Sequence, residues 1–196
     1  AIFDADFLPQ SDWLLRSLPY FKDPKIGVVQ TRWGHLNRAH SILTRVQAFA
    51  LDLHFGLEQI GRQAHGVFMN FNGTAGIWRK SCIEEAGNWS GTTLTEDLDL
   101  SYRAQLKGWR ILYRPDIITP AQLPQSVQAA RSQQFRWNKG GAQNFRQLWP
   151  RLWAKKDLSL KEKVFGTAHL FSSSIFFLVL ILIVLSLPLL WLKNSH

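Results

Sequence analysis

An uncharged stretch near the C-terminus places the strongest constraint on how this chain can fold. Residues 168–192 contain no Lys, Arg, Asp or Glu, and residues 175–185 are apolar throughout. About 25 residues of this kind are long enough to cross the hydrocarbon core of a bilayer. A buried helix of a soluble protein would normally keep a polar face, which this run lacks. The sequence therefore predicts a transmembrane helix over 168–192.

Basic residues gather on the N-terminal side of that predicted span. The formal net charge is +9, and ten of the 23 Lys and Arg residues lie from Arg131 onward, against two acids there, Asp157 and Glu162. Lys193 is the one base that follows the span. The positive-inside rule therefore predicts that the residues before the span face the cytoplasm. Anionic lipid headgroups and a nucleotide diphosphate are the natural counter-charges for this basic excess.

A nucleic-acid partner is the rival explanation for such a basic chain. The sequence contains no zinc-finger spacing, no aromatic RNA-binding signature and no long basic run, so we predict no nucleic-acid partner. Cys82 has no second cysteine with which to pair, which excludes disulfides and thiolate metal sites and suits a reducing compartment. We expect Cys82 to be a small buried hydrophobe.

The first of three polar motifs is Asp4-Ala5-Asp6. Alternate residues of a strand share a face, so a strand that starts over residues 1–3 would aim both carboxylates at one ion. Mg²⁺ and Mn²⁺ are commonly held by one or two carboxylates together with phosphate oxygens. An Asp-x-Asp pair is frequent by chance, so this prediction of a metal site depends on the motifs that follow.

The second motif is Thr95-Glu96-Asp97. Thr is a good N-cap, acids in the first turn complement the helix dipole, and Leu98, Tyr102 and Leu106 follow with helical spacing. This pattern predicts the start of a helix. A carboxylate placed there can also accept a proton from a reacting hydroxyl, and we choose Asp97 as that base. The structural and the catalytic interpretation are compatible.

The third motif, residues 133–137, contains Gln133, Arg136 and Trp137. Arg136 offers planar donors that match phosphate oxygens, Gln133 offers an amide donor, and Trp137 offers a flat face for a sugar ring. The alternative is an ordinary amphipathic helix face with a solvated Arg.

The order of these motifs resembles that of the processive family 2 glycosyltransferases, which include cellulose, mannan, chitin and hyaluronan synthases. Their pattern is D-x-D, then T/E-E-D, then Q-x-x-R-W, then membrane helices, and this chain matches it in that order. The segments 71–79 and 29–33 look most like the mannan and glucomannan synthase branch. The resemblance implies an α/β fold of the GT-A type and transfer of a hexose from a nucleotide-diphosphate sugar to a growing β-linked polysaccharide, with inversion at the anomeric centre.

The resemblance also implies roles for individual residues. Asp4 and Asp6 would contact the diphosphate and its metal, and Asp97 would be the base, with Glu96 shaping the site. The residues implied to bind substrates are Gln133, Arg136, Trp137, Phe71, Asn72, Gly73 and Thr74. The first two would hold the diphosphate, Trp137 would stack on the growing polymer, and residues 71–74 would line the acceptor pocket. The implied partners are GDP-mannose or UDP-glucose, a polysaccharide acceptor and a lipid bilayer.

Family members carry, before the D-x-D motif, a β-α-β region with a further Asp and usually a membrane helix. Because Ala1 falls inside the expected central strand, we interpret the chain as an internal fragment that is incomplete as an enzyme. We divide it into a partial GT-A catalytic domain over 1–124, interfacial helices over 125–167 and the transmembrane helix over 168–192. The expected location is a plasma, inner or Golgi membrane.

Two other functions stay open at this point. A glycosyltransferase that acts on a lipid acceptor, such as ceramide or polyprenyl phosphate, would carry related motifs and also suit a membrane anchor. An inactive membrane-associated binding fragment is the second, although intact acidic and Gln-x-x-Arg-Trp motifs disfavour it.

Hydrophobic periodicity predicts the remaining elements. A long helix over 42–60 has one apolar face, which we expect to be core or acceptor-channel wall. Gly87 and Gly108 are expected to end two further helices. The other expected elements are strands over 26–30, 67–71, 77–79 and 109–113, helices over 81–86, from 95 and over 125–153, and a loop containing Pro115, Pro120 and Pro124.

Overall fold

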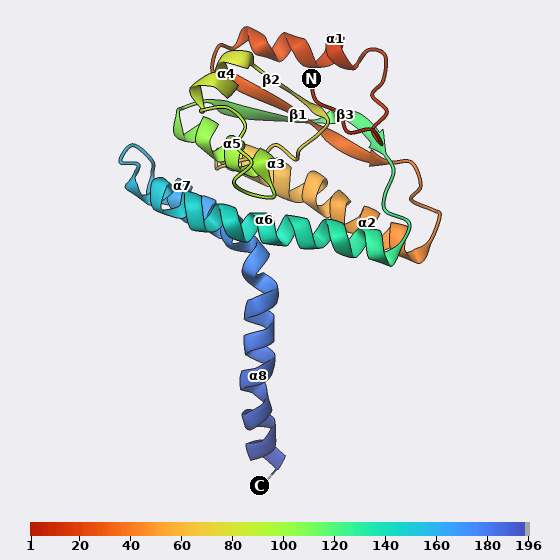
Figure 1. Cartoon of the computed structure of the whole chain (residues 1–196), viewed down its shortest axis with the longest axis vertical. Coiled ribbons are helices and arrows are strands. Elements are labelled where there is room, and N and C mark those ends of the chain that lie inside the picture. The colour runs from red at the N-terminus through yellow and green to blue at the C-terminus, as the bar shows by residue number, and fades with distance from the viewer. Residues whose placement is uncertain (195–196) are drawn as a thin grey trace.

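The computed structural model describes residues 1–194, and for residues 176 and 189–194 it describes the backbone alone. The strands are β1 (Ile26–His35), β2 (Gly76–Trp78) and β3 (Arg110–Ala121). The helices are α1 (Trp13–Ser17), η1 (Leu18–Lys22), α2 (Ile42–Leu53), η2 (His54–Glu58), α3 (Gln59–His65), α4 (Lys80–Glu85), α5 (Glu96–Leu106), α6 (Val127–Ala154), α7 (Leu160–Phe171), η3 (Ser172–Ser174) and α8 (Ile175–Asn194). The expected mixture of strands and helices is confirmed, and Figure 1 shows α1 above the sheet and the long α6 below it.

The three strands form one mixed sheet in the order β2-β1-β3, with β1 antiparallel to β2 and parallel to β3. The predicted strands near 26–30 and 77–79 are confirmed. The loop predicted from Pro115 onward is wrong, because β3 continues to Ala121. The β1–β3 register jumps from Thr31↔Arg114 to Arg32↔Ile118, so a bulge takes up Pro115 before pairing resumes. Proline is tolerated at bulges and in edge strands such as β3.

The strand predicted over 67–71 is wrong. Side chains of α5 take up the backbone groups that a neighbouring strand would otherwise pair. Gln105 accepts from the Met69 N–H (2.9 Å) and donates to the Met69 carbonyl (2.7 Å), and Ser101 Oγ accepts from the Phe71 N–H (2.9 Å). The segment therefore runs along α5 in an irregular, buried conformation that the apolar residue types alone do not distinguish from a strand.

The long helix predicted over 42–60 is confirmed and continues to His65, interrupted by a π turn at His54–Glu58. Its predicted role as core is wrong for the apolar stripe. Ile42, Val46, Phe49, Leu53, Leu57 and Ile60 are between 41% and 78% exposed. The face that packs inward carries the buried Thr44, Ala48, Phe55 and Gln59. Periodicity identifies an apolar face, but it does not say what covers that face.

Helices α4 and α5 begin and end close to where they were predicted, and Gly87 and Gly108 adopt positive φ just beyond their ends. The buried Cys82 has a pKa that burial raises to about 12, in line with the expected apolar role. The helix predicted over 125–153 is confirmed as α6. Buried Tyr102, Leu148 and Leu170 form a cluster that packs α5, α6 and α7 together, so α6 is part of the folded domain.

The prediction of one continuous helix over 168–192 is wrong. The first residues of that stretch complete α7, and the chain bends at Ser172–Ser174 before α8 runs away from the domain (Figure 1). A Cβ atom at Gly141 of α6 would collide with Ser173, so the bend lies in tight contact with α6. Among the described residues, no single helix has the length and apolar character to cross a membrane. Leu160–Ser174 and Phe177–Pro188 meet that test of length and composition as a pair bent by 68°.

Candidate active site

The start of α5 carries the predicted base. Thr95 occupies the N-cap position but makes no side-chain cap, because Asn144 of α6 donates from Nδ2 to both its Oγ1 and its carbonyl (2.8 Å each). Asp97 lies in the first turn, where its Oδ1 accepts from the Leu98 N–H at 2.8 Å. Helix α6 therefore holds the backbone from which Asp97 projects.

Two glycines allow α6 to come this close. A Cβ atom at Gly140 would collide with Thr95, including its backbone nitrogen, which lies 2.8 Å from the ideal Cβ position. Gln143, one turn further, accepts from the Leu94 N–H at 2.9 Å. Gly140 and Gly141 follow directly after the Gln133–Trp137 motif in the same helix, so this contact brings the third motif beside the second.

A buried glutamine shapes the loop that faces Asp97. Gln30 of β1 is fully buried, accepts from the Asn72 N–H (2.9 Å) and donates to the carbonyls of Thr74 (3.1 Å) and Ala75 (3.2 Å). Gly73 has φ of 82°, and a Cβ atom there would lie 3.2 Å from Asp97 Oδ2. The expected close backbone approach at Gly73 is thus present, and it is made to the carboxylate of Asp97.

The Asp-x-Asp motif lies in a turn and not on a strand, which corrects the sequence argument. Ile2 forms an isolated bridge to Gly76, and the Phe7 N–H then donates to the Asp4 carbonyl at 3.1 Å to close the turn. Thr74 Oγ1 accepts from the Asp4 N–H at 2.8 Å, which fixes the turn against the loop after Gly73. Both carboxylates are exposed, and the turn brings them together without the alternation of a strand.

Electrostatic effects confirm that the motifs converge. Burial raises the pKa of the Asp97 carboxyl to about 7; Glu96 and Asp4 add to the rise, and the Leu98 N–H opposes it. Partial burial also raises the pKa of Asp4, followed by the charges of Asp6 and Glu96, while the Arg136 guanidinium lowers it. Asp4, Glu96, Asp97 and Arg136 therefore share one electrostatic environment, although they are far apart in sequence.

A cavity of about 730 Å³ opens beside Asp97 between α2 and α6. Asn72, Gln133 and Trp137 line it together with Asp97, and Leu43, Val46 and Leu170 form an apolar wall. This volume falls in the range of small-molecule sites. Asp97 therefore lies where the cavity meets the Asp4–Asp6 turn.

Not every predicted binding residue faces this cavity. The Phe71 side chain is fully buried and packs edge-on against Trp78, so its prediction as a lining residue is wrong. Thr74 is also buried, and its contribution is the hydrogen bond to Asp4. Arg136 is exposed on α6 near Asp4, and Glu96 is exposed beside Asp97.

The carboxylates fit a divalent cation in a limited sense. Within the part of the chain that the structure describes, no group of three or more His, Cys, Asp or Glu side chains could hold a metal by itself. Mg²⁺ and Mn²⁺ often take one or two carboxylates and complete their shell with phosphate oxygens and water. The mutual repulsion of Asp4, Asp6 and Glu96, expressed in the raised pKa of Asp4, is what a bound cation would relieve.

Sequence reasoning missed the residues that assemble the site. Gly140 and Gly141 interrupt a helical pattern, a signal that often has a packing reason. Asn144 and Gln30 carry no such signal, because a buried amide is recognised only when its hydrogen-bond partners are known.

Comparison with known proteins places this geometry in context. The chain is 47% identical over 165 residues to the Oryza sativa subsp. japonica protein named Probable glucomannan 4-beta-mannosyltransferase 4, covering 84% of this chain and 30% of that protein. It is 44% identical over 165 residues to Glucomannan 4-beta-mannosyltransferase 9 of Arabidopsis thaliana, with 84% and 31% covered. The chain thus spans about a third of the length of these relatives.

A solved structure shares the fold. It is the mannosyltransferase PcManGT from Pyrobaculum calidifontis in complex with GDP-Man and Mn²⁺, with a TM-score of 0.61, 16% identity and coverage of 99% of this chain and 53% of that one. This likeness supports the GT-A-like fold. Residues 1–140 match the family model described as Glycosyltransferase like family 2. With the three motifs gathered around one cavity, the chain therefore belongs to glycosyltransferase family 2.

Proposed function

We propose that this chain is the catalytic core of a membrane-bound enzyme that transfers mannose from GDP-mannose to a growing β-1,4-linked mannan or glucomannan, with UDP-glucose as the second donor to test. The observation that carries the proposal is the position of Asp97, a carboxyl with a pKa of about 7 at the junction of a cavity and an acidic turn. The names of the relatives supply the donor and linkage for this proposal.

The catalytic base follows from that environment. A general base works best when its pKa lies near the working pH, and burial gives Asp97 that property. An acceptor hydroxyl that enters the cavity would lose its proton to Asp97 as its oxygen attacks the anomeric carbon of the donor. The bond from that carbon to the diphosphate oxygen breaks in the same step, which inverts the anomeric centre.

The leaving diphosphate would lie on the other side of Asp97. Arg136 is exposed near Asp4 and can donate to phosphate oxygens, while Gln133 adds an amide on the cavity side. A divalent cation held by Asp4 and Asp6 would supply further charge neutralisation for the departing diphosphate. Trp137, also in the cavity wall, offers its ring to the sugar of the acceptor.

Attachment to a membrane is part of the proposal. The exposed apolar stripe of α2 and α3, the exposed Trp149 and Trp153 of α6, and the apolar surface of α8 favour contact with a bilayer. We propose that α7 and α8 carry the chain into the membrane and that the catalytic part faces the cytoplasm, at a plasma, inner or Golgi membrane. In this arrangement residues 1–124 form the catalytic part and residues 125–167 lie at the interface.

One observation favours a second candidate, transfer to a lipid-linked acceptor. The cavity wall formed by Leu43, Val46 and Leu170 is apolar and would suit an acyl or prenyl chain as well as the apolar face of a sugar. The two functions differ in product, since one gives a ladder of oligosaccharides and the other a single glycolipid.

The test incubates membranes that contain the enzyme with labelled GDP-mannose or UDP-glucose in separate reactions, followed by digestion with a β-1,4-mannanase or a cellulase. Incorporation from GDP-mannose into a product that only the mannanase degrades is expected. A labelled product that resists both hydrolases and partitions into organic solvent would instead identify the lipid acceptor.

A further inference from the structure

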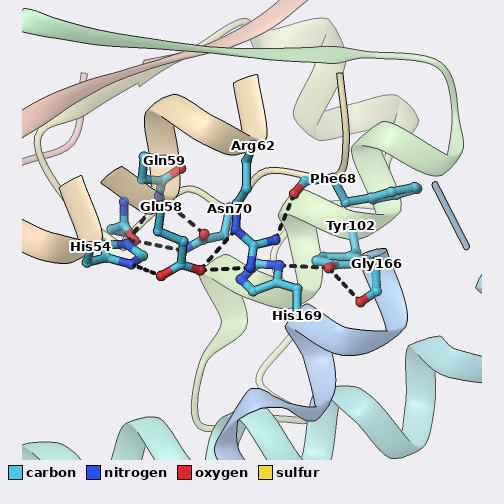
Figure 2. Close-up of polar contacts among 10 residues, drawn as sticks. His54, Glu58, Gln59, Arg62, Phe68, Asn70, Tyr102, Gly166 and His169 are labelled. Atoms are coloured by element: carbon cyan, nitrogen blue, oxygen red, sulfur yellow. Dashed lines mark hydrogen bonds and ion pairs between the residues drawn. The ribbon is translucent and has the colours of Figure 1, made fainter. Parts of the chain in front are cut away.

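Helices η2 and α3 carry a polar network that the motifs did not predict, and Figure 2 shows it reaching towards the loop before Gly73. Its first member is His54, which opens the π turn and lines the same cavity as Asp97. Short π segments inside α-helices are frequently found at functional sites. Here the turn places Gln59, five residues on, beside the imidazole, with Gln59 Nε2 at 3.2 Å from His54 Nε2.

One side of the His54 ring is fixed by a carboxylate. His54 Nδ1 lies 2.8 Å from Glu58 Oε2. Burial by itself raises the pKa of Glu58, but the bond to His54 and the charges of His54 and Arg62 outweigh it and lower the pKa to about 2. Arg62 donates to the other oxygen of Glu58 at 2.7 Å and 2.9 Å. Because ionised Glu58 can only accept, Nδ1 of His54 carries the proton in this bond.

The opposite side of the ring meets Asn72. His54 Nε2 lies 3.1 Å from Asn72 Oδ1, which also accepts from Asn70 Nδ2 at 2.7 Å. These two contacts hold the oxygen end of the Asn72 amide. Its nitrogen end, Nδ2, is buried and has no hydrogen-bond partner among the described residues, although Asn72 lines the cavity. A buried amide donor without a partner costs stability unless something accepts from it.

We propose that His54 is a positioning residue for the acceptor sugar. With Glu58 and Asn70 it fixes the Asn72 amide so that Nδ2 donates to a hydroxyl oxygen of the sugar in the cavity, beside the Asp97 carboxylate. The inference rests on the proposed function for the identity of the acceptor. It assigns the His54 side of the cavity to the acceptor, because the Asp4–Asp6 turn and Arg136 lie at the opposite side of Asp97.

The experiment measures binding of β-1,4-mannohexaose to the purified enzyme by calorimetry, in parallel with the affinity for GDP-mannose. Loss of one oriented, neutral hydrogen bond weakens binding by about three- to tenfold, and His54→Ala should show that loss for mannohexaose alone. His54→Gln keeps a donor near the Nε2 position and should bind mannohexaose like the wild type. His54→Asn reaches only towards Glu58 and should behave like His54→Ala.

Two further measurements separate positioning from a merely structural effect. His54→Ala added to Asn72→Ala should cause no additional loss, because the histidine acts through that amide. His65→Ala, an exposed histidine of α3, is the matched control and should leave both affinities unchanged. Wild-type mannohexaose affinity in His54→Ala, additive losses in the double variant, or an equal loss of GDP-mannose affinity would each overturn the proposal.

The outcome can be told apart from failure of the proposed function. Oligosaccharide binding needs no turnover, so the variant series is read even if the wild type transfers no mannose. A wild type that transfers mannose but does not bind mannohexaose overturns the inference alone, and a wild type that binds mannohexaose through His54 without transfer overturns only the proposed reaction.

Discussion

The Asp4–Asp6 turn and the first turn of α5 place the same side chain in two different environments. Asp4 and Asp6 are exposed and meet mainly other charges, whereas Asp97 lies between the Gly73 loop and its own helix. A pair of exposed carboxylates suits a cation, which neutralises both. A buried carboxyl with a pKa of about 7 suits proton transfer, since it changes state near neutral pH. The difference teaches that environment, and not residue type, assigns the two roles.

Replacing the buried member should have the largest effect. Asp97→Asn removes the proton acceptor, so turnover should fall by about two or more orders of magnitude while affinity for GDP-mannose stays within about twofold. Initial rates with saturating acceptor, together with calorimetry of donor binding, measure both quantities. Turnover at the wild-type level would remove Asp97 from the role of base.

Replacing the exposed members should instead change the metal requirement. Asp4→Asn combined with Asp6→Asn should raise the Mn²⁺ concentration that half-saturates activity by about tenfold or more, because two anionic ligands become neutral. The measurement is a Mn²⁺ titration of initial rate at fixed GDP-mannose, with Asp12→Asn, an exposed acid outside the turn, as control. An unchanged titration curve in the double variant would contradict the assignment of this turn to the cation.

The guanidinium beside the turn should matter for the donor only. Arg136→Ala should weaken binding of GDP-mannose by about tenfold or more, the range for hydrogen bonds to charged groups. Arg146→Ala, an exposed arginine of the same helix, should change this affinity little. Calorimetry in the presence of Mg²⁺ or Mn²⁺ compares the two, and equal affinities would exclude Arg136 as the diphosphate grip.

The pH dependence of the reaction should report the buried carboxyl. Because only ionised Asp97 accepts a proton, the turnover rate should rise by about tenfold between pH 6 and pH 8, around the pKa of about 7. A rate profile at saturating donor and metal tests this. A profile already flat at pH 6 would mean that bound substrate or metal returns the pKa of Asp97 to its ordinary value.

The smallest expected effect is on stability. A carboxyl whose pKa is raised on folding contributes stability that is present below about pH 4 and is lost as pH rises towards about 7. Asp97→Asn cannot ionise, so without ligands its melting temperature should exceed that of the wild type by a few degrees at pH 8 and by less at pH 4. Thermal denaturation at both values checks the sign, and a variant less stable than wild type at pH 8 would argue against a strained carboxylate.

Much of the site was visible in the sequence because its chemistry depends on residue type. The three motifs, the helix that begins at Thr95 and the close approach at Gly73 were all predicted and are present. Phe71 and the 67–71 segment were predicted wrongly, because an aromatic residue beside a polar loop can turn to the core or to the cavity with equal sequence support. The packing of Phe71 on Trp78 decides between them.

The sequence by itself determined which carboxylates, amides and aromatic rings are available, and the periodicity determined that α2, α3 and α6 are helices. Only the tertiary structure decided that Gly140 lets α6 touch Thr95, that burial prepares Asp97 as a base, and that the apolar stripe of α2 faces outward. The physical reason is that propensity and periodicity act over neighbouring residues. Burial, pKa and hydrogen-bond partners arise from groups that are distant along the chain and meet only after folding.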